Sequence, residues 1–107
     1  MKECALRLTR RYAAPPAEVW AALTAPESVA RWLGHALGTI VREEPPHVLE
    51  LDWSSGDEPA SAVRFELTES GGGTILVLEH RGIAAPRGMA AMGWWTRALE
   101  RLPLEAR

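Results

Sequence analysis

Three histidines are the side chains of this sequence best suited to acid–base or metal chemistry: His35, His47 and His80. No two of them stand three or four residues apart, so their spacing predicts no zinc site. His80 shares the alternating phase of Leu76 and Leu78, which directs its ring toward the face that those leucines bury. We expect His80 to be held by a hydrogen bond to nearby backbone. Contact with a ligand, or a role as general base, is the alternative.

The other groups that could react or bind anions occur in unfavourable surroundings. Cys4 has no base beside it in the sequence, so we expect it to be structural or incidental. The run Gly71–Gly73 is followed by neither Lys-Ser/Thr nor a helix, so it predicts a hairpin turn and not a phosphate-binding loop. The adjacent carboxylates Glu43–Glu44 and Asp57–Glu58 fall in polar turns, where both stay solvated. The sequence therefore predicts no catalytic residue, no metal and no cofactor.

Length, charge and cysteine content limit the class of protein. The 107 residues suffice for one domain, which we expect to span residues 1–107. A single cysteine excludes an intramolecular disulfide, and the net charge of −2 disfavours nucleic-acid binding. No apolar run reaches the roughly 18 residues of a membrane span, and the first residues do not resemble a signal peptide, so we expect a cytoplasmic protein. Eleven arginines against one lysine indicate a GC-rich bacterial gene.

The hydrophobic pattern predicts an α+β domain that positions these groups. Alternation with period two predicts strands over residues 4–12, 39–43, 47–53, 62–68 and 74–80. Apolar residues three or four apart predict helices over residues 17–23, 27–33 and 87–102. Thr24 is a candidate cap for the second helix, and Gly34 is a candidate left-handed stop. The order is a strand, two short helices, four antiparallel strands, and a long helix on one face of the sheet.

Tryptophan is unusually frequent, with five residues against one tyrosine and one phenylalanine. Trp20, Trp32, Trp53 and Trp95 fall on predicted buried faces, where such rings fill a core or line an apolar pocket, and we expect both in part. Trp94 lies about 100° around the last helix from Trp95 and is expected on its exposed side. The predicted core between this helix and the sheet consists of Leu49, Leu51, Phe65, Leu67, Leu76, Leu78, Trp95, Leu99 and Leu102.

Four stretches that together cover nearly the whole chain carry a family resemblance. They are Tyr12-x-Ala14-Pro15-x₃-Val19-Trp20-x-Ala22-Leu23-Thr24-x-Pro26-Glu27-x₄-Trp32, Gly38-x-Ile40-x₄-Pro45-Pro46-x₂-Leu49-x₃-Trp53, Gly72-Gly73-Thr74-x-Leu76-x-Leu78-x-His80-x-Gly82 and Gly93-Trp94-x₄-Leu99-x₂-Leu102. In this order they resemble the START-like helix-grip (SRPBCC) superfamily, and within it the branch named after the activator of Hsp90 ATPase. The resemblance implies a curved antiparallel sheet of about five strands around a long C-terminal helix, with an apolar cavity between them.

Relatives in this superfamily use the cavity for lipids and polyketides, or have become co-chaperones or cyclases. The resemblance therefore implies a small START-like domain that binds a hydrophobic small molecule or partner. Because the sequence shows no constellation of nucleophile, base and orienting residue, we expect the domain to be non-catalytic or at most weakly catalytic. A co-chaperone-like protein-interaction module and a polyketide cyclase or aromatase-like enzyme are the alternatives. The residues expected to line the cavity are Trp20, Trp32, Leu49, Leu51, Trp53, Phe65, Leu67, Leu76, Leu78, His80, Met92 and Trp95.

Two departures from the family pattern affect these expectations. Family members carry two further strands between the second short helix and the strand that begins here near Gly38, whereas only five residues separate Trp32 from Gly38 in this chain. The loss of these strands should shrink or open the cavity. An extra residue also follows Gly93-Trp94, so that Trp95 holds the helical spacing to Leu99.

The missing strands also leave one edge of the sheet uncovered. The strand Thr39–Glu43 loses its outer neighbour, and unpaired strand edges attract further strands. We therefore expect a homodimer, formed through this strand or through the face that carries Ile75 and Val77. The alternative is a monomer whose edge is shielded by the Gly34–Leu37 loop.

Overall fold

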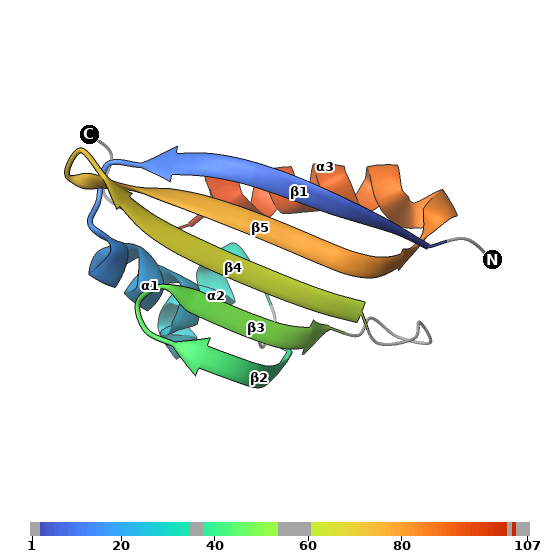
Figure 1. The fold of residues 1–107 in the computed structure, drawn as a ribbon, viewed down its shortest axis with the longest axis horizontal. Coiled ribbons are helices and arrows are strands. Elements are labelled where there is room, and N and C mark those ends of the chain that lie inside the picture. The colour runs from blue at the N-terminus through green and yellow to red at the C-terminus, as the bar shows by residue number, and fades with distance from the viewer. Residues whose placement is uncertain (1–2, 35–37, 54–60, 103, 105–107) are drawn as a thin grey trace.

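The strands and helices follow in the predicted order. A computed structural model of the protein describes residues 3–34, 38–53, 61–102 and 104. In these residues five antiparallel strands form one sheet in the order β1-β5-β4-β3-β2 (Figure 1). The strands are β1 (Glu3–Tyr12), β2 (Thr39–Glu44), β3 (Val48–Trp53), β4 (Ser61–Ser70) and β5 (Gly73–Ala84). The helices are α1 (Pro16–Thr24), α2 (Pro26–Trp32) and α3 (Gly88–Glu100), with a 3₁₀ turn, η1 (Ala85–Arg87), before α3. The predicted α+β helix-grip architecture is confirmed.

Alternating apolar and polar residues give each central strand one buried face. In β4, Val63, Phe65 and Leu67 are buried, while the residues between them are more exposed. The register places Phe65 opposite Leu49 of β3 and opposite Leu78 of β5. A continuous apolar row therefore crosses the sheet. The helices lie behind the sheet in Figure 1, with α3 along β1, so this face is covered.

A proline in the first turn of each helix sets the start of α1 and of α2, where its missing N–H costs no hydrogen bond. Ala25 ends α1 and precedes α2 with an extended backbone, because Pro26 restricts the residue before it. The prediction that Thr24 caps α2 is therefore wrong. Its hydroxyl donates instead to the carbonyl of Trp20, one turn back in α1, at 2.8 Å. Gly34 follows α2 with a φ of +83°, as predicted.

Strand β5 continues to Ala84, whereas the sequence pattern predicts its end at His80. Gly82 has a φ of +77°, and the register against β1 shifts between Cys4 and Leu6. This irregularity interrupts the alternation of apolar residues, so the last residues of the strand have no period-two pattern. His80 consequently lies within β5 and not at a strand end.

Helix α3 packs on the sheet through the side that its spacing predicts. Trp95 and Leu99 are almost fully buried, and so is Leu102 just beyond the helix. The hydroxyl of Tyr12 donates to the carbonyl of Leu99 at 2.9 Å, which joins the end of β1 to the last turn of α3. Burial raises the pKa of Tyr12 to about 12, so this phenol stays a donor at neutral pH.

Strand β2 lies outside this core. All six of its residues are exposed, its neighbour in the sheet is β3, and the register between the two shifts between Ile40 and Arg42. On the outer face Arg42 pairs with Glu44 and with Glu50, the latter at 3.1 Å. The Nε atom of Arg64 lies 4.0 Å from Glu50, so charged side chains link β2, β3 and β4.

Some of the sequence-based expectations fall outside the described residues: those on His35, on Asp57–Glu58, on the polar loop over 54–60 and on shielding by residues 35–37. In the part of the chain that the structure describes, no helix is long and apolar enough to cross a membrane.

Candidate functional site

The residues expected to line a cavity come together between the sheet and the helices. Strands β3, β4 and β5 supply most of them, while α2 and α3 each supply a tryptophan. Trp20 on α1 is half-buried at the margin of the core, and Met92 on α3 is 37% exposed. The remaining ten are buried: Trp32, Leu49, Leu51, Trp53, Phe65, Leu67, Leu76, Leu78, His80 and Trp95.

Aromatic rings occupy the space between the sheet and α3, and we call Trp32, Trp53, Phe65, Trp94 and Trp95 the inner aromatic cluster. The ring centroid of Trp95 lies 5.1 Å from that of Trp53, 5.8 Å from Phe65 and 6.4 Å from Trp32. Trp94, expected on the exposed side, is half-buried because its ring packs 6.0 Å from Trp53 and 4.9 Å from Trp95. The rings meet at tilted or edge-to-face angles, which aromatic pairs prefer. In this conformation they pack against one another.

His80 lies beside the inner aromatic cluster in a chain of hydrogen bonds. The indole Nε1–H of Trp95 donates to Nδ1 of His80 at 3.0 Å. Nε2 of His80 lies 2.7 Å from Oγ of Ser61, which donates its own proton to the carbonyl of Trp53 at 3.1 Å. An indole N–H can only donate, so Nδ1 is the acceptor and the proton of the neutral ring is on Nε2. The hydroxyl of Ser61 therefore accepts a hydrogen bond from His80.

This direction of the hydrogen bonds opposes nucleophilic catalysis by Ser61. A serine–histidine pair requires an imidazole nitrogen that accepts the hydroxyl proton, but Nε2 of His80 already carries one. Moving the ring proton to Nδ1 would place it against the N–H of Trp95. Burial also lowers the pKa of His80 to about 4, which makes the ring a weak base. In this conformation both ring nitrogens of His80 are held by side chains, and not by the backbone groups that the sequence led us to expect.

Ser61 is the member of this network that sequence reasoning missed. It stands at the boundary between a polar loop and β4, and His80 follows it by 19 residues. The sequence signal that could have identified Ser61 is its phase in the alternating pattern of β4. Ser61 is two residues before Val63, so both lie on the same face of the strand. Val63 pairs directly with His80. Recognising that phase requires the register between β4 and β5, which the sequence does not state.

One buried donor is left without a partner. Within the described residues, the indole Nε1 of Trp32 is the buried side-chain nitrogen or oxygen that makes no hydrogen bond. The ring is fully enclosed, with the centroids of Phe65 and Trp95 each 6.4 Å away. Buried N–H groups are nearly always paired, because leaving one unpaired costs about 1–3 kcal/mol. This N–H is therefore available to an acceptor that enters the inner aromatic cluster.

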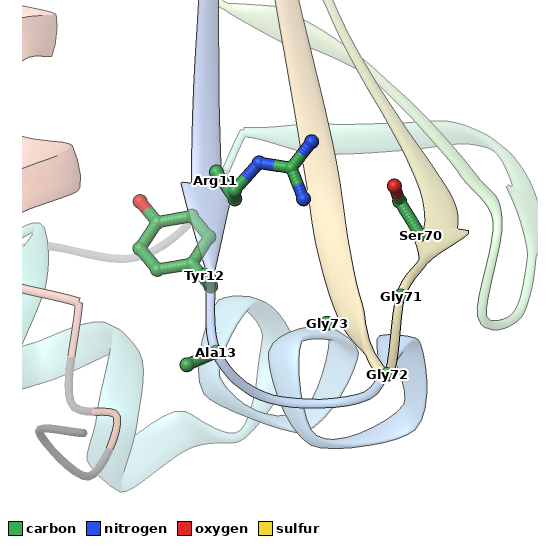
Figure 2. Close-up of a pocket in the computed structure, with 7 residues that line it drawn as sticks. All are labelled: Arg11, Tyr12, Ala13, Ser70, Gly71, Gly72 and Gly73. Atoms are coloured by element: carbon green, nitrogen blue, oxygen red, sulfur yellow. The ribbon is translucent and has the colours of Figure 1, made fainter.

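Two hollows formed by described residues lie away from the inner aromatic cluster. One, of about 590 Å³, surrounds the β4–β5 turn, where Gly71 and Gly72 have φ values of +57° and +84° as the hairpin prediction requires. Figure 2 shows Arg11 reaching across β5 toward Ser70, while Tyr12 points the opposite way. The other hollow, of about 440 Å³, lies between α1 and α2. Neither is lined by a residue expected to form the cavity.

The remaining chemical candidates stay apart from one another. Cys4 is half-buried next to Gly88 at the start of α3. Nδ1 of His47 lies 3.2 Å from the carbonyl of Leu67, and Glu43–Glu44 are exposed on β2. Among the described residues, no group of three histidines, cysteines or acidic residues could hold a metal ion.

Comparison with known proteins agrees with this architecture. The family described as activator of Hsp90 ATPase homolog 1-like protein (AHSA1) matches residues 34–105. No curated protein matches the sequence. Among solved structures, CalU16 from Micromonospora echinospora is 33% identical over 92% of this chain and 71% of its own, with a TM-score of 0.83. An AHSA1-like protein from Rhizobium etli is 26% identical over 99% of this chain and 91% of its own, with a TM-score of 0.79.

A third structure extends the fold comparison. DynU16, from the dynemicin biosynthetic locus, is 24% identical over 92% of this chain and 45% of its own, with a TM-score of 0.80, and supports the fold alone. The family match covers most of the chain, and the likeness to CalU16 adds the segment before it. The chain belongs to the activator of Hsp90 ATPase homolog 1-like family, a branch of the START-like SRPBCC superfamily.

Proposed function

We propose that this domain binds a hydrophobic small molecule between the sheet and α3 and does not transform it. The unpaired indole N–H of Trp32 carries the proposal, because it is a hydrogen-bond donor enclosed by aromatic rings. Ligand sites are mostly apolar, with a few polar groups that orient the ligand. An apolar skeleton with one acceptor oxygen, such as an aromatic ketone, suits this combination.

Binding requires the rings of the inner aromatic cluster to move apart. Trp94 is half-buried and Met92 is partly exposed, so this part of α3 is where the cluster approaches solvent. Methionine adapts its shape readily, which favours opening at this point. The proposed ligand contacts are the twelve residues named from the sequence, with Trp32 as hydrogen-bond donor.

The lack of catalysis rests on the hydrogen bonds of His80. Both of its ring nitrogens are engaged, and the proton on Nε2 prevents it from activating Ser61. A cyclase-like enzyme would need a base that is free to take a proton from substrate, so we rank this alternative below binding. The expected compartment is the cytoplasm, since a protein with a single cysteine needs no oxidising environment for its fold.

A protein-interaction module is the second candidate. Met89 is 91% exposed on α3, and Met92 stands three residues further on the same helix. Exposed methionines are common on surfaces that bind other proteins. A partner that covers α3 would protect both methionine side chains from oxidation by peroxide, whereas a ligand enclosed in the inner aromatic cluster would leave Met89 as reactive as before.

The test is a titration with prodan, a naphthalene ketone whose emission shifts to the blue in apolar surroundings. We expect saturable binding with blue-shifted emission, and Trp32→Phe should weaken it about tenfold because the ketone loses a buried hydrogen bond. Leu78→Trp should fill the site and abolish binding while the far-UV circular dichroism stays unchanged. Met89→Ala, at an exposed position, is the control and should bind as the wild type does.

Two outcomes would contradict the proposal. Unchanged prodan binding by a folded Leu78→Trp variant would move the site elsewhere. Unchanged binding by Trp32→Phe would remove the role of the indole as donor. Native mass spectrometry of freshly purified protein adds an independent measurement, since a hydrophobic adduct retained by the wild type should be absent from Leu78→Trp.

A further inference from the structure

We infer that two copies of this domain pair antiparallel through the outer edges of their β2 strands. The two-fold axis passes at Val41, so that the two sheets join into one. This inference concerns a second copy of the same chain and does not depend on the ligand proposed above.

Among the described residues, no strand pairs with the outer edge of β2. Strand β2 is last in the sheet order, with β3 as its neighbour, and all six of its residues are exposed. Ile40 and Val41 are 46% and 59% exposed, and large apolar side chains are this exposed at few described positions. Val41 has no Cα partner on β3, because the register shifts at this point. An edge strand presents unpaired N–H and C=O groups, which a second strand can satisfy.

The opposite edge of the sheet shows the protection that this part of β2 lacks. Strand β1 carries Glu3, Arg7 and Arg11 at exposed positions along its length, and charged residues on an edge discourage pairing. On β2 the charged residues occupy only the second half, beginning at Arg42. The half with Thr39, Ile40 and Val41 has no such residue.

The order of residues in β2 favours one register. With the axis at Val41, each Val41 stands opposite its own copy, and Ile40 stands opposite Arg42 of the second copy. The two valines meet at the centre, and no like charges face each other. An axis at Arg42 would place two arginines opposite each other. An axis further along would bring Pro45, which has no N–H, into the pairing.

The test is light scattering after size exclusion, over protein concentrations from low to high micromolar. We expect the wild type to approach twice the monomer mass of 11.7 kDa as the concentration rises. Val41→Lys should return it to the monomer mass, because it places two like charges directly opposite each other at the axis. Val77→Lys, on the outer face of β5, is the matched control and should remain dimeric.

Three results would overturn the inference. The wild type could remain a monomer at every concentration, which would mean that the irregularity at Val41 turns the edge away from a second strand. Val41→Lys could remain dimeric with unchanged tryptophan emission. Loss of the dimer in Val77→Lys alone would assign the interface to the face with Ile75 and Val77. Val41→Pro, which removes the N–H of Val41 from β2, checks the result without adding charge.

Discussion

The imidazole of His80 can accept the hydrogen bond from Trp95 that links α3 to the sheet only while the ring is neutral. Protonation puts an N–H on Nδ1, toward which the N–H of Trp95 already points, so the hydrogen bond between them is lost. The ring is hydrogen-bonded to Ser61 and Trp95 and packs edge-to-face with Trp53, and none of these three carries a charge that could offset the added proton. A neutral histidine in this position therefore makes the junction between β5 and α3 sensitive to acid.

We predict a loss of stability in acid that originates at His80. Burial lowers its pKa to about 4 in the folded protein, against 6.5 for an unperturbed histidine. As the pH falls below 6.5, the unfolded chain binds the proton first. Stability is therefore lost between about pH 6.5 and about pH 4, by roughly 3 kcal/mol in all. Urea unfolding at about pH 7.5 and about pH 4.5 measures the loss.

The variant His80→Asn separates this effect from that of the carboxylates. Its side-chain oxygen keeps an acceptor for Trp95 but does not titrate in this range. The variant should start less stable at neutral pH and lose less stability in acid than the wild type. If both proteins lost the same amount, the acid sensitivity would come from other groups.

At the scale of helices and strands, the faces were predictable and the irregularities were not. The alternation in β4 and the helical spacing in α3 each indicate which face of the element is buried. This is because the residues of a buried face recur every two positions in a strand and every three or four positions in a helix. The extension of β5 beyond His80 depends on a register shift against β1, and the extended backbone of Ala25 depends on the proline that follows it. Neither feature produces a repeating spacing of apolar residues in the sequence.

The candidate site likewise has a part that the sequence predicts and a part that only the structure shows. The buried positions that face α3 could be read from the pattern, because they share the phase of neighbouring apolar residues. The partners of His80 could not, since Ser61 and Trp95 are 19 and 15 residues away in the chain. The unpaired N–H of Trp32 depends on the positions of several elements at once, so only the structure reveals it.

The docking of α3 gives the prediction at this scale. Leu99 is almost fully buried against the sheet, so Leu99→Ala should lower the free energy of unfolding by about 2–5 kcal/mol. Met89→Ala, at an exposed position of the same helix, should change it by less than about 0.5 kcal/mol. Urea unfolding followed by tryptophan emission measures both. A loss below about 0.5 kcal/mol for Leu99→Ala would show that the helix is not held by this face.

At the scale of the whole molecule, one core joins the three α-helices and four of the five strands that the structure describes. Buried side chains from β1, β3, β4 and β5 belong to the same cluster as those from α1, α2 and α3. No residue of β2 belongs to it. Because the core is continuous, we expect residues 1–107 to unfold as a single cooperative unit. The strand β2 is held mainly by its ladder to β3, so it can open without breaking the core.

The last prediction therefore concerns unfolding as a whole. Urea transitions followed by tryptophan emission and by far-UV circular dichroism should coincide, because no second core exists among the described residues to unfold separately. Amide hydrogens of β2 should exchange much faster than those of β4 and β5 in dilute solution. Raising the protein concentration should slow exchange in β2 selectively, because pairing with a second copy buries its outer edge. Two separate urea transitions would instead divide the chain into independent units. Fast exchange in β2 at every concentration would mean that no second copy pairs with β2 and that β3 alone holds this edge strand.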